Sequence, residues 1–342
     1  MLPEVVVSAN GRVYASVTDN DWPDQGYLLA LDPDGSEIWR KHGKDPHRNS
    51  AAVGFDGVVY FAQWGGAEIV ALGPDGRQLW GTGLLYEELT SVMIAWDGLL
   101  FVGVTRWPLD DELWGQPHPR FGGLYALTAD GDTVFEVESD WDIYSTPAIG
   151  ADCSIYLAAG RDLVSLDAGG RERWRVHTGL GLYDDGPSVG PDGTVYVNGT
   201  LQENSILVAI TPSGEPKWEL PLGGFPRGGP AIGNDGTVYV RSALPEGESE
   251  LLAVDLEGQV RWSAAVQGQG FAPPTVDASD VVYVGTESGG LYALEAPGRE
   301  RWRFDPGDVI FGRPVLGPDG TLYVGTTSDW GHTSGRVYAI GH

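Results

Sequence analysis

A repeat of eight similar units is the feature of this sequence that most constrains its fold. Each unit contains an aromatic residue within a short run of β-branched residues, such as Thr194-Val195-Tyr196-Val197. This aromatic residue recurs at intervals of 40 to 55 residues, at Tyr14, Tyr60, Phe101, Tyr156, Tyr196, Tyr239, Tyr283 and Tyr323. A period of roughly 40–45 residues predicts a propeller, a solenoid or another stacked array.

Each unit divides into four strand-like pieces joined by short turns. The first piece is short and rich in small residues, as at 230–233, and a tight turn such as 234–236 follows it. The second piece holds the aromatic residue, and the third reads Leu-Tyr-Ala-Leu at 291–294. A glycine-containing turn then leads into a fourth piece that carries a tryptophan or phenylalanine.

The second turn is the most regular part of the repeat. In all seven complete units a glycine precedes the fourth-strand aromatic by four residues: Gly35 and Trp39, Gly76 and Trp80, Gly131 and Phe135, Gly170 and Trp174, Gly214 and Trp218, Gly258 and Trp262, and Gly298 and Trp302. Glycine fits a tight hairpin turn because it adopts a positive φ without a steric penalty. The first turn has glycine in six of eight units, and Cys153 and Asp280 take that place in the others. We therefore interpret Cys153 as a turn residue rather than a reactive thiol.

Four short antiparallel strands per unit predict an all-β, eight-bladed β-propeller formed by one domain over residues 1–342. We expect blades at about 4–41, 50–82, 91–137, 146–176, 187–220, 230–264, 274–304 and 313–341. The eighth unit lacks its fourth piece, so the last blade should have three strands; the alternative is that the sequence is part of a longer chain. A solenoid is the alternative, but it requires polar capping repeats that neither end of the sequence provides.

Charge and cysteine content exclude several classes of function. Asp and Glu number 48 against 21 Lys and Arg, which gives a net charge of −27. Because this charge repels phosphate and anionic lipid, we expect neither a nucleic acid nor a membrane as partner. We also expect a monomer. The single cysteine excludes an internal disulfide and multi-cysteine metal sites. The N-terminal residues do not form a signal peptide, which fits a cytoplasmic protein or an exported protein that has been processed.

The repeat resembles that of the pyrroloquinoline-quinone-like (PQQ-like) β-propellers. The resemblance rests on Ala30-Leu31-Asp32…Gly35…Trp39 and on its copies, such as Ala253-Val254-Asp255…Gly258…Trp262. It implies that the connections between second and third strands share one face with the connections that enter each blade, around the mouth of a central channel. The family's quinone enzymes often carry a vicinal disulfide, which one cysteine cannot form. We therefore expect neither PQQ nor another cofactor. A calcium site at Asp19-Asn20-Asp21…Asp24 is a weaker interpretation than solvated turn acids.

Several tryptophans outside the repeat positions fall on the predicted loops of adjacent blades 8, 1, 2, 3 and 4. We predict that they form an aromatic-rich binding surface, with two nearby histidines; the alternative is that they pack the long loops onto the body. These candidates are Trp22, Trp64, Trp107, Trp114, Trp141, Trp330, His118 and His332.

A second group of candidates precedes the first strand of several blades and should surround the channel mouth. These residues are Arg48, Tyr144, Asp184, Arg227, Phe271 and Arg313. Alternating charged and aromatic side chains suit a small polar or anionic ligand, although they also suit packing of the rim with bound water. The histidines have no metal-binding spacing, so we predict no metal site.

Together these observations favour a non-catalytic scaffold that presents the tryptophan-rich face and the channel mouth to a protein or a ligand. The alternative is a small-molecule-binding protein or an atypical enzyme with its site at the channel mouth. No nucleophile–base pair or phosphate-binding loop is present in the sequence, so we assign no catalytic residue.

Overall fold

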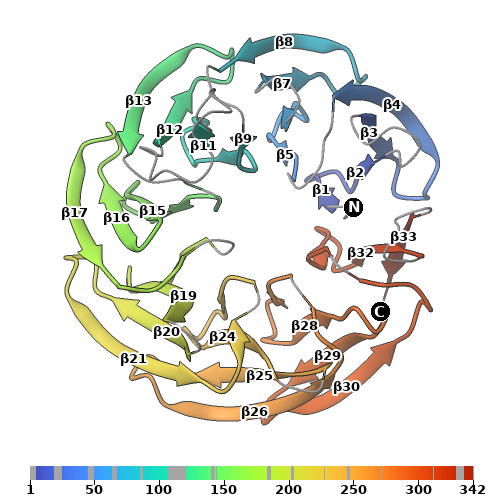
Figure 1. The fold of residues 1–342 in the computed structure, drawn as a ribbon. Helices are drawn as coiled ribbons and strands as arrows, with labels where there is room; N and C mark the ends of the chain where they lie inside the picture. The colour runs from blue at the N-terminus through green and yellow to red at the C-terminus, as the bar shows by residue number, and fades with distance from the viewer. Residues whose placement is uncertain are drawn as a thin grey trace, which may run out of the picture.

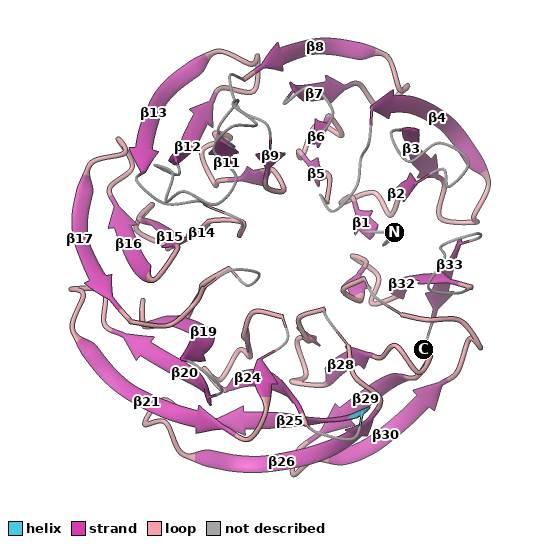
Figure 2. Cartoon of the chain, in the orientation of Figure 1, coloured by secondary structure: helices cyan, strands magenta, loops and turns pink. Residues whose placement is uncertain are grey.

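The computed structural model describes residues 5–18, 25–44, 50–63, 68–84, 88–106, 121–139, 143, 145–182, 186–201, 204–226, 228–244, 247–270, 272–310, 312–328 and 335–341. In this part of the chain the regular structure is almost entirely β-strand (Figure 2), and the strands form eight sheets around a central opening (Figure 1). Seven sheets contain a path of four antiparallel strands and the eighth contains three. The prediction of an eight-bladed propeller with a three-stranded last blade is confirmed. No described helix has the length and apolar character needed to cross a membrane.

The strands of each blade run from the channel outwards in chain order. The innermost strands are β1 (Val5–Val7), β5 (Ala52–Val53), β10 (Met93–Ile94), β14 (Ala148–Ile149), β18 (Ser188–Val189), β23 (Ala231–Ile232), β27 (Thr275–Val276) and β31 (Val315–Leu316). The second strands are β2 (Val13–Thr18), β6 (Val59–Gln63), β11 (Leu100–Arg106), β15 (Ile155–Ala159), β19 (Val195–Leu201), β24 (Val238–Ala243), β28 (Val282–Gly285) and β32 (Leu322–Thr327).

The third and fourth strands complete the blades and form the outside of the ring. The third strands are β3 (Gln25–Leu31), β7 (Glu68–Leu72), β12 (Phe121–Leu127), β16 (Asp162–Leu166), β20 (Asn204–Ile210), β25 (Glu248–Val254), β29 (Leu291–Glu295) and β33 (Gly335–Ile340). The fourth strands are β4 (Glu37–Lys44), β8 (Gln78–Gly83), β13 (Thr133–Ser139), β17 (Glu172–His177), β21 (Pro216–Leu222), β26 (Val260–Gln267) and β30 (Arg299–Phe304). Along the fourth strands, exposed side chains alternate with half-buried ones, because one face of each strand packs on the next blade and the other face meets solvent.

Two short strands that we did not predict show which connections share a face. β9 (Glu88–Leu89) and β22 (Phe225–Pro226) lie on the connections that enter blades 3 and 6, and they pair with the far ends of β11 and β24. Isolated bridges at Gly181↔Thr200 and Val309↔Thr327 repeat this arrangement in blades 5 and 8. The entering connections therefore lie beside the ends of the second strands, on the same face as the connections between second and third strands.

The turn between the third and fourth strands combines a left-handed glycine with a bulge. In blade 1 the amide of Asp32 donates to the Ser36 carbonyl at 2.9 Å, the Gly35 amide donates to the Asp32 carbonyl, and Gly35 has φ of 86°. The pairing register shifts at the same point, between Ala30 and Leu31, and at the equivalent point of every other complete blade. A left-handed glycine beside an extra residue is the geometry of a bulged hairpin.

The interpretation of Cys153 and Asp280 as turn residues is confirmed. They are the described non-glycine residues with positive φ, at 63° and 59°, and they occupy the first-turn position where other blades have glycine.

The fourth-strand aromatic of each of blades 1 to 6 packs on the second-turn glycine of the next blade. A Cβ atom added to Gly76 would lie 2.7 Å from the ring of Trp39, which shows how closely the ring covers the glycine. The indole N–H also donates to a carbonyl of the covered turn, from Trp39 to Pro74 (3.0 Å), Trp80 to Ala129 (2.8 Å), Trp174 to Pro212 (2.9 Å) and Trp218 to Leu256 (2.9 Å). Within its own blade each aromatic contacts the ring of the second strand, as in Tyr196–Trp218 at 5.7 Å.

The apolar core is divided into eight clusters, and each cluster lies between two successive blades. Seven of them include the fourth-strand aromatic of the preceding blade. The cluster between blades 8 and 1 closes the ring with Val5, Val13, Ala15 and Tyr323, and it contains no such aromatic. Ring closure therefore depends on packing that differs from the packing at every other blade interface.

We expect Trp218→Ala to lower the free energy of unfolding by about 2–4 kcal/mol, because it removes a large half-buried ring and an inter-blade hydrogen bond. The matched control is Trp96→Ala, because Trp96 is 79% exposed. This control should change stability by less than about 0.5 kcal/mol. Thermal and urea unfolding of both variants measure the difference. Equal losses in the two variants would show that docking contributes nothing specific.

Stability should fall at alkaline pH through the second-strand tyrosines. Burial raises the pKa of Tyr196, Tyr239 and Tyr283 from 10.0 to about 12, and the Tyr283 hydroxyl also donates to Asp277 at 2.9 Å. Since the folded state favours the protonated phenol, this stabilisation is complete below about pH 10 and is lost between about pH 10 and 12. Tyrosinate absorbance and circular dichroism should therefore change together in that range. Ionisation of these three tyrosines near pH 10 in the folded protein would contradict the prediction.

Candidate functional site

The face that carries the entering connections and the second-to-third connections is strongly asymmetric. In blades 1, 3 and 8 the second and third strands are separated by six or more residues, 19–24, 107–120 and 328–334, whereas two to five residues separate them in blades 2, 4, 5, 6 and 7. In blades 4 and 5 only 160–161 and 202–203 separate them. Because the ring places blade 8 beside blade 1, the strand ends that flank the three longest connections lie within one half of the ring, in blades 8, 1 and 3 (Figure 1). Hereafter we call this the loop face.

Most of the predicted binding residues lie outside the described residues. These are Trp22, Trp64, Trp107, Trp114, Trp141, Trp330, His118, His332, Arg48, Tyr144, Asp184, Arg227 and Phe271. The described strand ends that flank Trp22, Trp107 and Trp330 belong to blades 1, 3 and 8. The aromatic surface remains a prediction whose location on the ring follows from its flanking strands.

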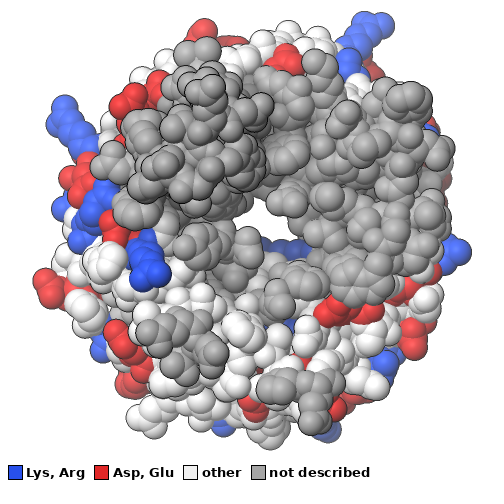
Figure 3. Space-filling model, viewed as in Figure 1, with Lys and Arg blue, Asp and Glu red and all other residues white. Residues whose placement is uncertain are grey.

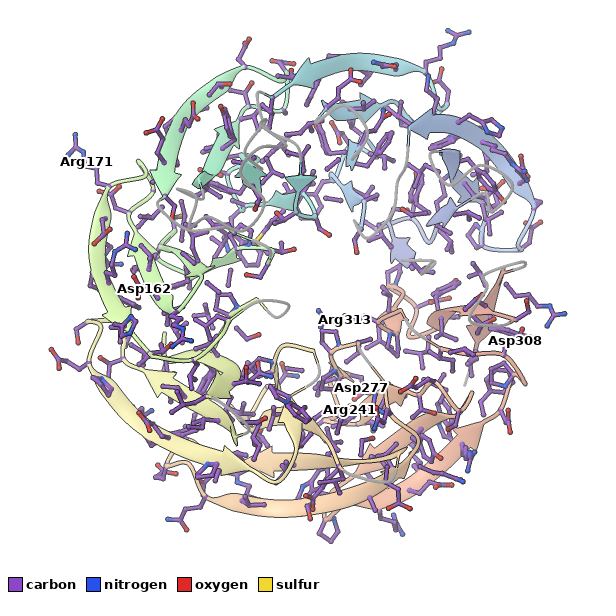
Figure 4. The ribbon with its side chains drawn as sticks, in the orientation of Figure 1. Asp162, Arg171, Arg241, Asp277, Asp308 and Arg313 are labelled. Carbon is purple, nitrogen blue, oxygen red and sulfur yellow. The ribbon has the colours of Figure 1, made fainter. Side chains whose placement is uncertain are left out.

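Arg313 is the predicted site residue that the structure describes. It is exposed and lies on the inner side of the ring (Figure 4), beside the opening that the space-filling view shows at the centre of the molecule (Figure 3). Its Nε atom donates to Thr275 Oγ1 at 3.2 Å, and Thr275 in turn donates to the Pro314 carbonyl. Arg313 therefore places a cationic group, held by the neighbouring blade, at the channel.

Blade 4 holds an ionic cluster that we did not predict. Asp162, whose side chain is 14% exposed, accepts from Arg175 at 3.3 Å and lies 2.7 Å from Nδ1 of His177. A carboxylate beside an imidazole is the orienting half of an acid–base site. Here Asp162 and His177 stand opposite each other on β16 and β17. Arg175 also binds Glu172 at 2.8 Å. The cluster joins these two strands, and its contacts include no nucleophilic side chain among the described residues.

A buried arginine joins blades 6 and 7. The side chain of Arg241, on β24, is fully buried (Figure 4). Its Nη1 atom donates to the Gly285 carbonyl at 2.6 Å, Nη2 donates to the Gly268 carbonyl at 3.2 Å, and Nε and Nη2 both donate to Ser249 Oγ. A Cβ atom at Gly270 would collide with the guanidinium group. Since a buried cation is costly unless it is well hydrogen-bonded, this network is a specific structural device.

The repeat contains a signal that identifies Arg241. It stands two residues after the second-strand aromatic, where the other blades have short side chains: Ser16, Ala62, Gly103, Ala158, Asn198, Gly285 and Gly325. A long charged residue in a column of short residues marks a position with different packing. Aligning the repeats on this column would have identified Arg241 before the structure was known.

In blades 4, 5 and 6 a carboxylate of the first turn is paired with a basic residue of the same blade's fourth strand. Asp192 binds Lys217 at 3.2 Å, and Asp235 binds Arg261 at 2.8 Å. Burial opposes ionisation of both carboxyls, but hydrogen bonds from Thr194 or Thr237 and the adjacent cation outweigh it, so both pKa values are lowered. In blade 4, Asp152 and Arg173 form the same pair at 3.0 Å. In the described part of the chain, no group of three or more His, Cys, Asp and Glu residues could hold a metal ion.

The fold and repeat define a β-propeller of the PQQ-repeat class. A family model described as outer membrane protein assembly factor BamB matches residues 24–115, 113–234 and 202–341. The chain therefore belongs to this family of PQQ-repeat propellers. No curated protein is significantly similar to it in sequence.

Solved structures with the same fold differ widely in sequence. BamB from Moraxella catarrhalis has a TM-score of 0.70 and 15% identity, and the match covers 98% of this chain and 96% of that chain. The dihydro-heme d1 dehydrogenase NirN in complex with DHE has a TM-score of 0.70 and 16% identity, with 99% and 75% covered. A streptogramin B lyase has a TM-score of 0.59 and 14% identity, with 86% and 94% covered. These similarities establish the fold alone.

We expect Arg241→Met to lower the free energy of unfolding by about 2–4 kcal/mol, because the buried Gly285 carbonyl and Ser249 hydroxyl lose the donors that Arg241 supplies. The Gly268 carbonyl keeps Ser249 as its donor. Arg171→Met is the matched control, since Arg171 is exposed at the edge of the ring (Figure 4). The control should stay within about 0.5 kcal/mol of the wild type. Urea unfolding compares the two. A wild-type midpoint for Arg241→Met would show that the network is dispensable.

Proposed function

We propose that this protein is a non-catalytic scaffold that holds a protein partner on its loop face, without PQQ or another cofactor. The observation that carries the proposal is the family match, which spans residues 24–341 and whose description is that of an assembly factor. The proposal takes from this description the general role, binding another protein, and no particular partner.

The geometry of the ring supports this assignment. Eight blades joined by successive core clusters make a rigid frame, and functional segments are commonly carried as loops on such frames. The three longest connections belong to blades 8, 1 and 3, and their sequences contain Trp22, Trp107, Trp114 and Trp330, while Trp64 lies in the shorter connection of blade 2. Tryptophan is enriched among residues that dominate protein interfaces, so this half of the loop face is the proposed contact surface.

Net charge indicates the chemistry of the partner. A net charge of −27 attracts a basic surface and accelerates its association, and salt weakens that attraction. We therefore propose a partner with a basic contact surface whose association rate falls as ionic strength rises.

Arg313 favours a second candidate function, the binding of a small anionic ligand at the channel mouth. Its guanidinium group is exposed beside the channel and is held by Thr275. Arginine in this setting suits a carboxylate or phosphate group. Native mass spectrometry of protein purified gently from its source separates the candidates, because the scaffold retains a polypeptide and the binding protein retains a small molecule.

We expect Trp107→Ala together with Trp330→Ala to weaken partner binding by about 30-fold or more, as loss of an aromatic anchor does. The melting temperature should remain within about 2 °C of the wild type. Trp96→Ala is the matched control, since this exposed tryptophan lies on a first turn, at the opposite face. Titration of the partner measures the affinity. A strong loss of stability with unchanged binding would show that the loop tryptophans only pack the loops.

A further inference from the structure

We propose that the outer edge of blade 8 is a docking site for an extended segment of another polypeptide. That segment would supply a fourth strand for blade 8 and place a tryptophan on the turn at Gly35. We call the site the open strand position and define it by β33, the turn 32–36 and Asp319. It lies at the outer rim of the ring, apart from the loop face. Strand docking at blade 8 and partner binding on the loop face can therefore be tested, and can fail, independently.

The first observation is the free edge of β33. This strand pairs with β32 from Thr327↔Gly335 to Leu322↔Ile340, and no described strand pairs with its other side. In the other seven blades a fourth strand covers the corresponding edge, and Figure 1 shows these strands as long outer arcs that are interrupted at blade 8. A six-residue edge with unpaired backbone groups is a template for strand addition.

The second observation is the uncovered turn at Gly35. A Cβ atom at Gly35 would have nothing within 4 Å, whereas at Gly76 it would lie 2.7 Å from Trp39. The corresponding glycines of blades 3 to 7 are covered by Trp80, Phe135, Trp174, Trp218 and Trp262 in the same way. Gly35 is exposed, while all six others are buried or half-buried. The structure therefore contains a receiving surface for an aromatic ring that no described residue occupies.

The ring of Tyr323 marks the inner side of the same position. In each of the other seven blades the second-strand aromatic contacts the fourth-strand aromatic, with centroids 5.7 to 6.2 Å apart. Tyr323 has no such ring partner among the described residues. An incoming tryptophan opposite Ala339 would restore this contact, because Trp262 stands opposite Ala253 at the same register in blade 6.

The charge of the site specifies the residue that precedes the tryptophan. Asp319 accepts from the amide and the hydroxyl of Thr321 at 3.0 Å, which is how Asp192 and Asp235 are bound in blades 5 and 6. Those two carboxylates also bind Lys217 and Arg261, the residues directly before Trp218 and Trp262. Asp319 has no basic partner among the described residues. Asp56 and Asp97 of blades 2 and 3 also lack a basic partner in the described part of the chain, and there an apolar residue precedes the aromatic. The pairs of blades 5 and 6 therefore favour, as the best occupant, Lys or Arg followed by Trp, with an apolar residue two positions later.

A second copy of the chain fits this description poorly. Its own described tryptophans with a preceding basic residue, such as Trp174 and Trp218, are docked within its ring. Its free edge, β33, carries Tyr338 after Val337 rather than tryptophan after a basic residue. A separate polypeptide with a basic-Trp strand matches the edge, the turn and the carboxylate together.

The test uses the whole protein and a synthetic peptide that copies residues 258–267, which include β26 with Arg261 and Trp262. We expect the peptide to bind and to slow hydrogen exchange of amides within 335–340. Replacing its tryptophan with alanine should weaken binding about 30-fold or more. Asp319→Asn should weaken binding about twofold to fivefold, because an exposed ion pair is lost while the side-chain oxygen can still accept from Thr321. A peptide with arginine replaced by glutamine should bind Asp319→Asn and wild type equally.

The matched control is Asp192→Asn, since blade 5 already contains its fourth strand. It should leave peptide affinity unchanged, and so should Trp107→Ala on the loop face. Equal affinity of the tryptophan and alanine peptides, or protection elsewhere than 335–340, would overturn the proposal. Native mass spectrometry and hydrogen exchange without peptide test whether a second copy of the chain already occupies the edge. A dimer with 335–340 already protected would show that a second copy occupies the edge, and it would also overturn the proposal.

Discussion

The packing of a fourth-strand aromatic on the turn glycine of the next blade is the interaction on which the rest of the ring depends. The glycine meets two requirements at once, because the bulged turn needs a positive φ and the incoming ring leaves no room for a Cβ atom. The indole hydrogen bond then fixes the ring on a carbonyl of that turn, as from Trp218 to Leu256. Each contact joins one blade to its successor, so the ring is built from nearest-neighbour interfaces in the manner of other repeat proteins.

The interface between blades 8 and 1 is the place where this pattern stops. There the ring closes through Val5, Val13, Ala15 and Tyr323, without a docked aromatic. The contacts that join blades 7 and 8 are fuller, since Trp302, Phe304, Tyr338 and Ile340 pack against the same cluster and the rings of Phe304 and Tyr338 are in contact. Blade 8 is therefore held more extensively on one side than on the other. A strand added to β33 would bring to the last interface the kind of contact that the other seven already have.

Periodicity explains which parts of the structure could be predicted from the sequence. The glycine–aromatic spacing, the eight second-strand aromatics and the turn positions of Cys153 and Asp280 all recur, so each copy supports the interpretation of the others. The two short strands β9 and β22 could not be predicted in this way, because they arise on irregular connections and depend on a tertiary pairing with β11 and β24. The candidate binding residues on the loops belong to the same non-repeating class. Among the predicted site residues, Arg313 lies in the described part, at the channel, where its position before a first strand indicated.

Departures from the repeat are the informative positions in a protein of this kind, because the repeat itself is explained by folding. Arg241 stands in a column of short residues, and the structure shows that it crosses an interface through buried carbonyls. Asp319 and Gly35 follow the repeat themselves, but within the described residues Asp319 lacks the basic partner that its counterparts have in blades 4 to 6, and Gly35 lacks the aromatic cover that the other six turn glycines have. The first kind of departure adds an interaction that stabilises the ring. The second kind leaves a repeated geometry of the chain unfilled. The six covered turn glycines and the seven ring pairs define the size and register of the group that completes it, and the ion pairs of blades 4 to 6 indicate its charge.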